Sequence, residues 1–158
     1  MSVSEEAFRA ALSRFASGVT VVTTRDRAGR LHGLTVSAFC SVSLNPPMVL
    51  VCIEKATGSH YAFAESSIFT VSMLNESHGP LSEHFATELE DKFFNLATQI
   101  SANGLPCIEN ATAVLDCQVR FAHDGGDHTI FVGEVKSVKL GEAFPLVYFR
   151  GFYRKLDS

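Results

Sequence analysis

"GLTVSAFCSVSLNPPMVLVCI", residues 33–53, has the pattern of two strands joined by a turn. Alternate side chains of a strand point to opposite faces. One face of the first strand is therefore a row of hydroxyls interrupted by an aromatic ring: Thr35, Ser37, Phe39, Ser41 and Ser43. The other face is apolar and is predicted to be core: Val36, Ala38, Cys40, Val42 and Leu44. Pro46 and Pro47 interrupt the pattern, and residues 48–54 are apolar at nearly every position, which predicts a strand buried on both faces.

Most other patterned segments are predicted strands, rich in β-branched residues: residues 19–24, 68–74, 113–123, 129–140 and 145–153. The sequence "DGGD" at 124–127 predicts a hairpin turn. Short helices are predicted from Ser4 to a stop at Gly18 and over residues 57–66, while 77–103 has mixed helical spacings. We therefore expect one domain over residues 1–158 that is mainly β (α+β), a closed or partly closed β-barrel with short flanking helices.

Charge and composition exclude several classes of function. The 158 residues carry a formal net charge of −4 and 46% hydrophobic residues, without a polybasic run. Nucleic acids and anionic membrane surfaces require a positive patch, so we expect neither as a partner. No apolar run approaches a membrane span, and Glu5 and Glu6 stand where a signal peptide needs positive charge. We expect a cytoplasmic protein.

Sequence motifs of reactive side chains are absent. The sequence has no glycine-rich dinucleotide turn, phosphate-binding loop, zinc-protease helix or serine nucleophile elbow, and its six histidines lack metal-ligand spacing. The four cysteines form no C-x-x-C pair and are predicted to be buried free thiols: Cys40, Cys52, Cys107 and Cys117. If the protein is an enzyme, we expect a bound cofactor, and no metal, to supply the chemistry.

The row of hydroxyls has two interpretations. It is either the solvated outer face of a barrel strand or the lining of a ligand site. The ring of Phe39 is unusual on a solvent face, and the neighbouring strand is predicted to be buried on both sides, which favours a ligand site. Hydroxyls and backbone N–H groups donate hydrogen bonds without carrying charge, which suits phosphate and ribityl oxygens.

Five segments, in this order and spacing, resemble the short-chain flavin reductases, the reductase components of two-component flavin monooxygenases: "FASGVTVVTT", "GLTVSAFCSVSLNPPMVLVCI", "SIFTVSML", "GGDHTIFVGEV" and "PLVYFRGFYR". The resemblance spans essentially the whole chain. It implies an FMN-binding split β-barrel, Greek-key-like, that forms a homodimer. It also implies an NAD(P)H:flavin oxidoreductase that reduces FMN or FAD with NADH or NADPH and supplies reduced flavin to a separate partner oxygenase.

The resemblance also implies which residues form the site. Those expected to meet the ribityl chain and the phosphate are Thr35, Val36, Ser37, Ala38, Ser41 and Val42. Those expected to border the isoalloxazine, mainly through backbone groups, are Pro46, Val51, Cys52 and Ile53. Ser59 and His60, at the start of a short helix, are expected to help hold the phosphate, because N–H groups and the helix dipole favour an anion there. Phe85 and Lys92 are expected near the outer edge of the flavin or its phosphate.

His128, in the sequence "GGDH", is the residue that the resemblance places on the nicotinamide side, where its imidazole would bind the dinucleotide or shape the nicotinamide slot. The alternative is an ordinary turn histidine. Tyr148 and Arg150 are expected to close the pocket; otherwise Tyr148 packs in the core and Arg150 forms a surface ion pair. The sequence leaves FMN or FAD, and NADH or NADPH, open.

Three other functions stay open. A non-catalytic split-barrel module would bind flavin for electron transfer or storage and would need no nicotinamide site. A related oxidase of a pyridoxine-type phosphate would require several cationic phosphate ligands, which the sequence hardly supplies. A structural β-barrel dimer would carry a solvated serine face and bind no flavin at all.

Overall fold

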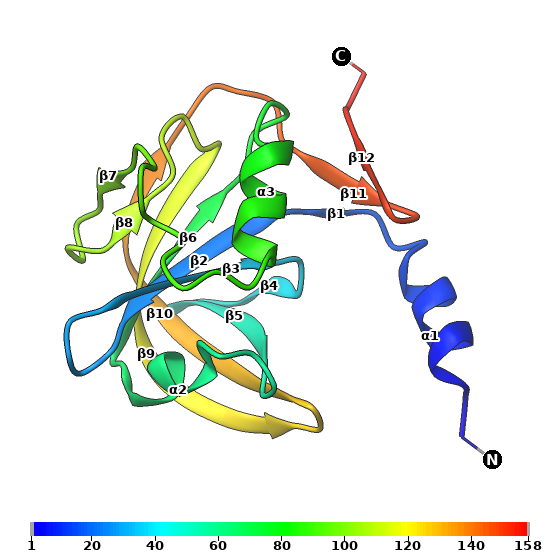
Figure 1. Cartoon of the computed structure of the whole chain (residues 1–158), viewed down its shortest axis with the longest axis horizontal. Coiled ribbons are helices and arrows are strands. Elements are labelled where there is room, and N and C mark those ends of the chain that lie inside the picture. The colour runs from blue at the N-terminus through cyan, green and yellow to red at the C-terminus, as the bar shows by residue number, and fades with distance from the viewer. Residues whose placement is uncertain (1, 158) are drawn as a thin grey trace.

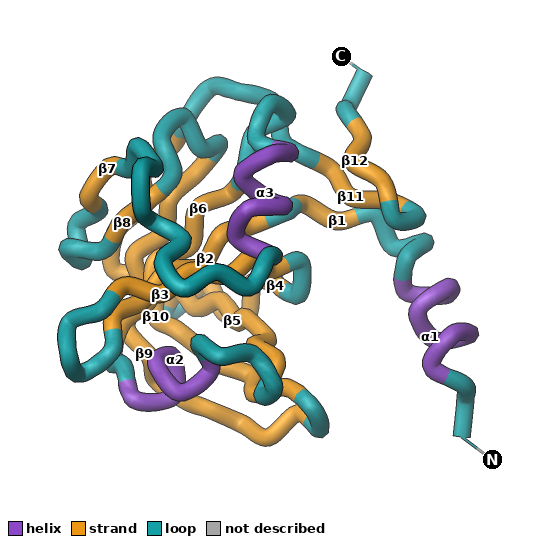
Figure 2. The backbone as a smooth tube through the Cα atoms, in the orientation of Figure 1, coloured by secondary structure: helices purple, strands orange, loops and turns teal. Residues whose placement is uncertain are grey.

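Segments rich in Val, Ile, Thr and Phe pair into one sheet of seven strands (Figures 1 and 2). The computed structural model describes residues 2–157. The strands are β2 (Thr20–Arg25), β3 (Leu31–Val36), β4 (Phe39–Leu44), β5 (Pro47–Glu54), β6 (Ile68–Met73), β9 (Ala113–Gly125) and β10 (His128–Leu140). Their spatial order is β3-β2-β6-β9-β10-β5-β4, and every neighbouring pair is antiparallel. The prediction of a mainly β fold with few short helices is confirmed.

The two edge strands of this sheet, β3 and β4, are consecutive in the chain and are separated only by Ser37 and Ala38. From Val36 to Phe39 the chain can span at most about 11 Å. The sheet must therefore curl until its two edges meet, and it becomes a barrel with a split beside β3. The sequence predicted one continuous strand here; that prediction was wrong because the chain leaves one edge of the sheet at Ser37 and enters the other after Ala38.

This break changes which side chains of the second half are core. Phe39 packs against the barrel core, whereas Val42 is 46% exposed and Leu44 is 91% exposed. The predicted apolar core face therefore holds for Val36, which is buried, and fails along β4. In β5 burial alternates, with Val49, Val51 and Ile53 inside and the side chains between them half-buried. The prediction that this strand is buried on both faces was also wrong.

Two apolar clusters cover the two faces of the sheet, because consecutive valines of β2 point to opposite sides. Val22 belongs to the cluster inside the barrel and Val21 to the cluster on the outer face. The inner cluster consists of Val22, Val36, Val49, Val51, Ile53, Phe63, Phe69, Val71, Leu115, Cys117 and Phe131. The outer cluster consists of Val19, Val21, Leu74, Phe85, Cys107, Ile108, Ala111, Val114 and Leu146.

Short helices lie at the rim of the sheet. The helix α2 (His60–Glu65) lies at one end of the barrel, and α3 (Gly79–Ala86) crosses β2 and β3 (Figure 1). The first helix, α1 (Glu5–Leu12), begins as predicted, since the Ala7 N–H donates to the Ser4 hydroxyl at 3.2 Å. It ends before Gly18, which instead lies in β1 (Ser17–Gly18). A two-stranded ribbon, β7 (Gln99–Ile100) with β8 (Pro106–Cys107), completes the rim.

The C-terminal segment is a hairpin and not the single strand that was predicted. Strands β11 (Val147–Phe149) and β12 (Phe152–Arg154) are joined by Arg150 at φ 52° and Gly151 at φ 79°. Two left-handed residues are what a tight hairpin turn requires. Together with β1 these strands form a small three-stranded sheet. We call α1, β1, β11 and β12 the arm; Figure 1 shows α1 and β12 standing away from the large sheet.

All four cysteines are free thiols. Cys107 and Cys117 are buried as predicted, Cys52 is half-buried, and Cys40 is exposed because it lies on the outer side of β4. Within residues 2–157, no helix is long and apolar enough to cross a membrane.

Gly33 on β3 is expected to be essential to the way α3 packs. A Cβ added at Gly33 would lie 2.7 and 2.9 Å from ring carbons of Phe85 and 3.0 Å from Phe93. We expect Gly33→Ala to lower the free energy of unfolding by about 1–3 kcal/mol, since both rings must shift. Thermal melting measures this. Gly18→Ala is the matched control, because nothing lies within 4 Å of its added Cβ. Equal melting temperatures for the two variants would contradict the packing argument.

Candidate functional site

A cavity of about 400 Å³ lies at the split of the barrel. The open edge of β3 forms one wall, the end of β5 forms the other, and the end of α3 with the loop after it forms the roof. Because β3 pairs only with β2, the backbone groups along its other edge have no strand partner. The lining residues are Leu34, Thr35, Val36, Ser37, Ala38, Cys52, Ile53, Glu54, Ala56, Thr57, Phe85, Ala86, Glu88, Lys92 and His128.

Many of the residues predicted for the site meet in this one cavity, although they come from four separate segments. They are Thr35, Val36, Ser37, Ala38, Cys52, Ile53, Phe85, Lys92 and His128. The hydroxyl row reaches the cavity only through its first two members. Of these, Ser37 is exposed, whereas the Thr35 hydroxyl donates to the backbone carbonyl of Ser82 in α3. Thr35 therefore fixes α3 to β3.

Other predicted residues of β4 and β5 lie outside the lining. Ser41 and Val42 are exposed on β4 beyond the break in the strand. Pro46 lies at the tip of the β4–β5 hairpin, after a cis peptide bond. Val51 is fully buried in the inner cluster, so that only its backbone is available.

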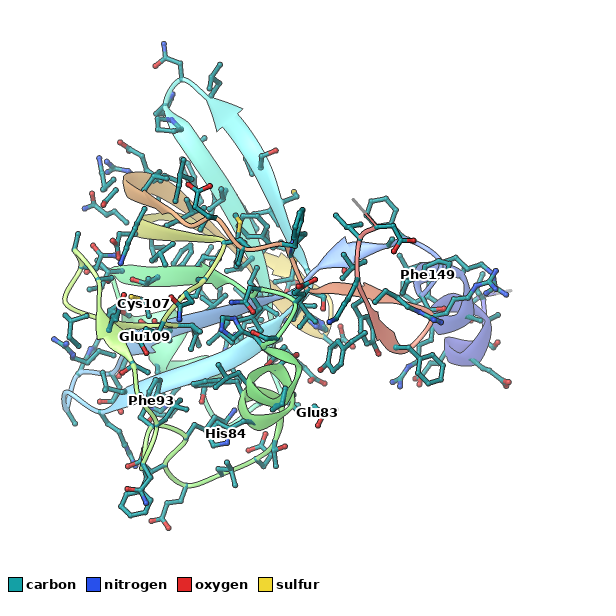
Figure 3. The ribbon with its side chains drawn as sticks, turned by 90° about the horizontal axis from the view of Figure 1, so that it is seen from above. Glu83, His84, Phe93, Cys107, Glu109 and Phe149 are labelled. Carbon is teal, nitrogen blue, oxygen red and sulfur yellow. The ribbon has the colours of Figure 1, made fainter. Side chains whose placement is uncertain are left out.

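The predicted site residues farther along the chain lie in three different places. Ser59 lines a second cavity of about 310 Å³ that adjoins the first and shares Glu88 and Lys92 with it. His60 turns the other way, with its Nε2 2.8 Å from the Thr129 hydroxyl of β10. Tyr148 and Arg150 belong to the arm, where Figure 3 shows the neighbouring Phe149 far from His84 and Phe93 beside the roof.

Six lining residues were missed by the sequence analysis: Leu34, Glu54, Ala56, Thr57, Ala86 and Glu88. Four of them lie next to predicted site residues in the sequence, and this proximity to Thr35 or Ile53 was the signal that could have identified them. They are Leu34, Glu54, Ala56 and Thr57. Ala86 and Glu88 had no such signal, because the region around α3 lacks a clear period.

Lys92 is the cation of the cavity and is 9% exposed. Its Nζ donates to the carbonyl of Gly33 at 3.1 Å and to that of Phe85 at 2.7 Å. Burial lowers the pKa of Lys92, and nearby Glu88 opposes that shift. Because its two partners lie on β3 and at the end of α3, this side chain holds the roof on the wall. An ammonium has three protons, so one is left for a ligand.

His128 stands where the first cavity meets a third one of about 610 Å³ that extends to α1. The two cavities share Cys52, Glu54 and His128. The Nδ1 of His128 lies 2.7 Å from the Asp127 carboxylate, and this contact lowers the pKa of Asp127. Burial raises the pKa of the Cys52 thiol.

The second cavity is bordered by a hydrogen-bonded cluster around Asp26. One carboxylate oxygen of Asp26 lies 3.0 Å from His32 Nε2 and 2.9 Å from the Tyr61 hydroxyl. The other accepts the backbone N–H groups of Ala28 and Arg30. The contact with His32 is the largest of the causes that hold the pKa of Asp26 well below its usual range. The carboxylate is thus ionised.

The lining fits a phosphorylated cofactor with an apolar ring system. A volume of about 400 Å³ lies in the usual range for small-molecule sites. Hydroxyls, unpaired backbone groups of β3 and the ammonium of Lys92 suit polar oxygens, while the exposed methyl groups of Ala38, Ala56 and Ala86 suit a ring. Within residues 2–157, no group of three His, Cys, Asp or Glu side chains could hold a metal ion.

Comparison with known proteins gives consistent matches over nearly the whole chain. An NADH-dependent flavin reductase of Rhodococcus is 38% identical over 94% of this chain and 85% of its own length. The reductase component of 4-hydroxyphenylacetate 3-monooxygenase from Thermus thermophilus is 40% identical over 96% of this chain and 97% of its own length. The structure of the NADH:FAD oxidoreductase SgcE6 of Streptomyces globisporus, solved with NAD and FAD fragments, superposes with a TM-score of 0.91 at 31% identity. The match covers 99% of this chain and 97% of SgcE6.

The model of the flavin reductase like domain matches residues 12–157. The matched range contains every strand of the large sheet and all the residues of the first cavity. The chain belongs to the flavin reductase like domain family.

Proposed function

We propose that this chain transfers a hydride from NADH to a flavin bound in the cavity beside β3, and that the reduced flavin passes to a separate oxygenase. The observation that carries the proposal is the cavity itself. It combines an apolar wall, unpaired strand-edge groups and one ammonium, and no group of three His, Cys, Asp or Glu side chains among the described residues could hold a metal ion. Relatives at 38% and 40% identity are an NADH-dependent flavin reductase and a monooxygenase reductase component.

The residues of the cavity bind and orient rather than react. Bound flavin would supply the hydride acceptor, and NADH the donor. The open edge of β3 and Ser37 would hold the polar chain of the flavin, and the exposed apolar residues of the lining would exclude water from the ring. Positioning and exclusion of water can supply much of the rate when both reactants are held in contact. Contacts through neutral hydroxyls are weaker than an arginine clamp, which suits a flavin that must leave.

We further propose that two copies pair through the arm. On α1, Phe8 is 59% exposed and Leu12 is 53% exposed, and no residue of the helix is buried. On β12, Phe152 is 66% exposed. Strands of two and three residues are marginal without cover, so a second copy is the occupant that would bury these side chains.

The direct test is the loss of NADH absorbance when purified protein is mixed with FMN or FAD. We expect flavin-dependent oxidation of NADH. Ser37→Val should weaken flavin binding by about 0.5–3 kcal/mol, since it removes a donor from the cavity. Flavin binding without NADH oxidation would support a non-catalytic module, and no flavin binding would reject the cavity as the flavin site. Ser67→Val, on an exposed position before β6, is the matched control.

His128→Ala should raise the KM for NADH about five- to thirtyfold and change the flavin Kd by less than about twofold, because a lost hydrogen bond to a bound ligand costs about one to two kcal/mol. Steady-state kinetics and fluorescence titration measure the two constants. Equal effects on both would place His128 against the flavin instead. The corresponding change at a histidine outside the cavities, His123→Ala, should leave both constants unchanged.

Sedimentation of the intact chain should show a particle of twice the chain mass. Phe8→Glu with Leu12→Glu should convert it to the monomer, because charges on both turns of α1 oppose burial of the helix. Ile100→Glu changes a 70% exposed side chain outside the arm and should leave the dimer intact. A double variant that still sediments as a dimer would exclude the arm as the interface.

A further inference from the structure

In the cluster beside the second cavity, Asp26 fixes the direction of its hydrogen bond with His32. Asp26 is 3% exposed and ionised, so its oxygens can only accept. His32 Nε2, 3.0 Å away, must therefore carry a proton in every state of the ring. This leaves the other nitrogen, Nδ1, as the atom at which His32 gains or loses its proton.

His32 Nδ1 lies 3.1 Å from the Ser59 hydroxyl. When His32 is neutral, Nδ1 accepts the Ser59 proton, and the lone pairs of the Ser59 oxygen face the cavity. When His32 is protonated, Nδ1–H donates to the Ser59 oxygen, and the hydroxyl proton is free to point elsewhere. Ser59 is thus an acceptor toward the cavity in one state of His32 and a donor in the other.

The charges around the second cavity favour the donor state once an anion enters. Arg30 and Lys92 face the cavity, as do Glu88 and Glu90, and Asp26 lies behind His32. Two cations against three carboxylates leave one net negative charge while His32 is neutral. Protonation of His32 cancels that charge. The Tyr61 hydroxyl, the remaining titratable group beside the ring, donates to Asp26.

We propose that Asp26, His32 and Ser59 form a proton-linked subsite for the phosphate of the flavin, in which binding of the phosphate draws one proton onto His32 and turns the Ser59 hydroxyl toward the phosphate. The proposal rests on the proposed function, because it takes flavin as the ligand of the adjoining cavities. The proton comes from solvent and returns to it when the flavin leaves. Asp26 and His32 act through Ser59 and are positioning residues.

The test compares FAD with riboflavin, which has the ring and the ribityl chain but no phosphate. FAD is preferred to FMN because a phosphate monoester itself titrates near pH 6. We expect FAD to bind about tenfold more tightly at about pH 6 than at about pH 8.5, the range in which histidine changes charge. Riboflavin affinity should change by less than about twofold. Calorimetry in buffers of different ionisation enthalpy should show proton uptake with FAD alone.

His32→Gln and Ser59→Ala should each abolish the difference in pH dependence between FAD and riboflavin, because His32 acts on the phosphate through Ser59. His123→Gln, a histidine on β9 outside the cavities, should behave as the wild type. FAD binding without proton uptake in the wild type, or an unchanged pH profile in folded His32→Gln, would overturn the proposal. The calorimetry needs no variant, so it decides even if His32→Gln does not fold. If neither flavin binds the wild type, the proposed function fails as well.

Discussion

The structure depends on a covalent constraint: two residues, Ser37 and Ala38, join the opposite edges of a seven-stranded sheet. The sheet has to curl for so short a connection to reach. It does not close completely, because β3 pairs only with β2 and β4 pairs only with β5. An unpaired strand edge is usually a liability. Here it is covered by α3 and its following loop, and the space between is the candidate flavin cavity.

The cover over this edge is held by three kinds of contact. Gly33 gives room for the ring of Phe85, the Thr35 hydroxyl reaches the backbone of α3, and the buried ammonium of Lys92 joins the carbonyls of Gly33 and Phe85. A buried cation bonded only to carbonyls and shifted toward its neutral form is costly. A ligand that accepts its third proton would lessen that cost. The Lys92 side chain therefore contributes both to the stability of the fold and to ligand affinity.

The sequence was informative where the pattern is local. The serine cap of α1, the "DGGD" hairpin and the β-branched strands were all predicted. The break after Ser37 was missed because each residue there is compatible with a strand, and only long-range pairing shows that two edges meet. The turn at Arg150 was missed because arginine rarely adopts a left-handed conformation. The site followed the same rule in part. Residues 35–38 beside β3 and residues 52–53 of β5 were found, although their neighbours Leu34 and Glu54 were not. The link from Asp26 through His32 to Ser59 was missed because it joins residues that are separated in the chain.

Cys52 gives the cavity a chemical property of its own. Its thiol borders both the first and the third cavity, and its pKa is raised by burial. Reduced flavins react with dioxygen to give hydrogen peroxide, and peroxide attacks thiolates rather than thiols. A protonated thiol reacts with peroxide more slowly than a thiolate does, so the burial of Cys52 lowers its rate of sulfenic acid formation at the cavity wall.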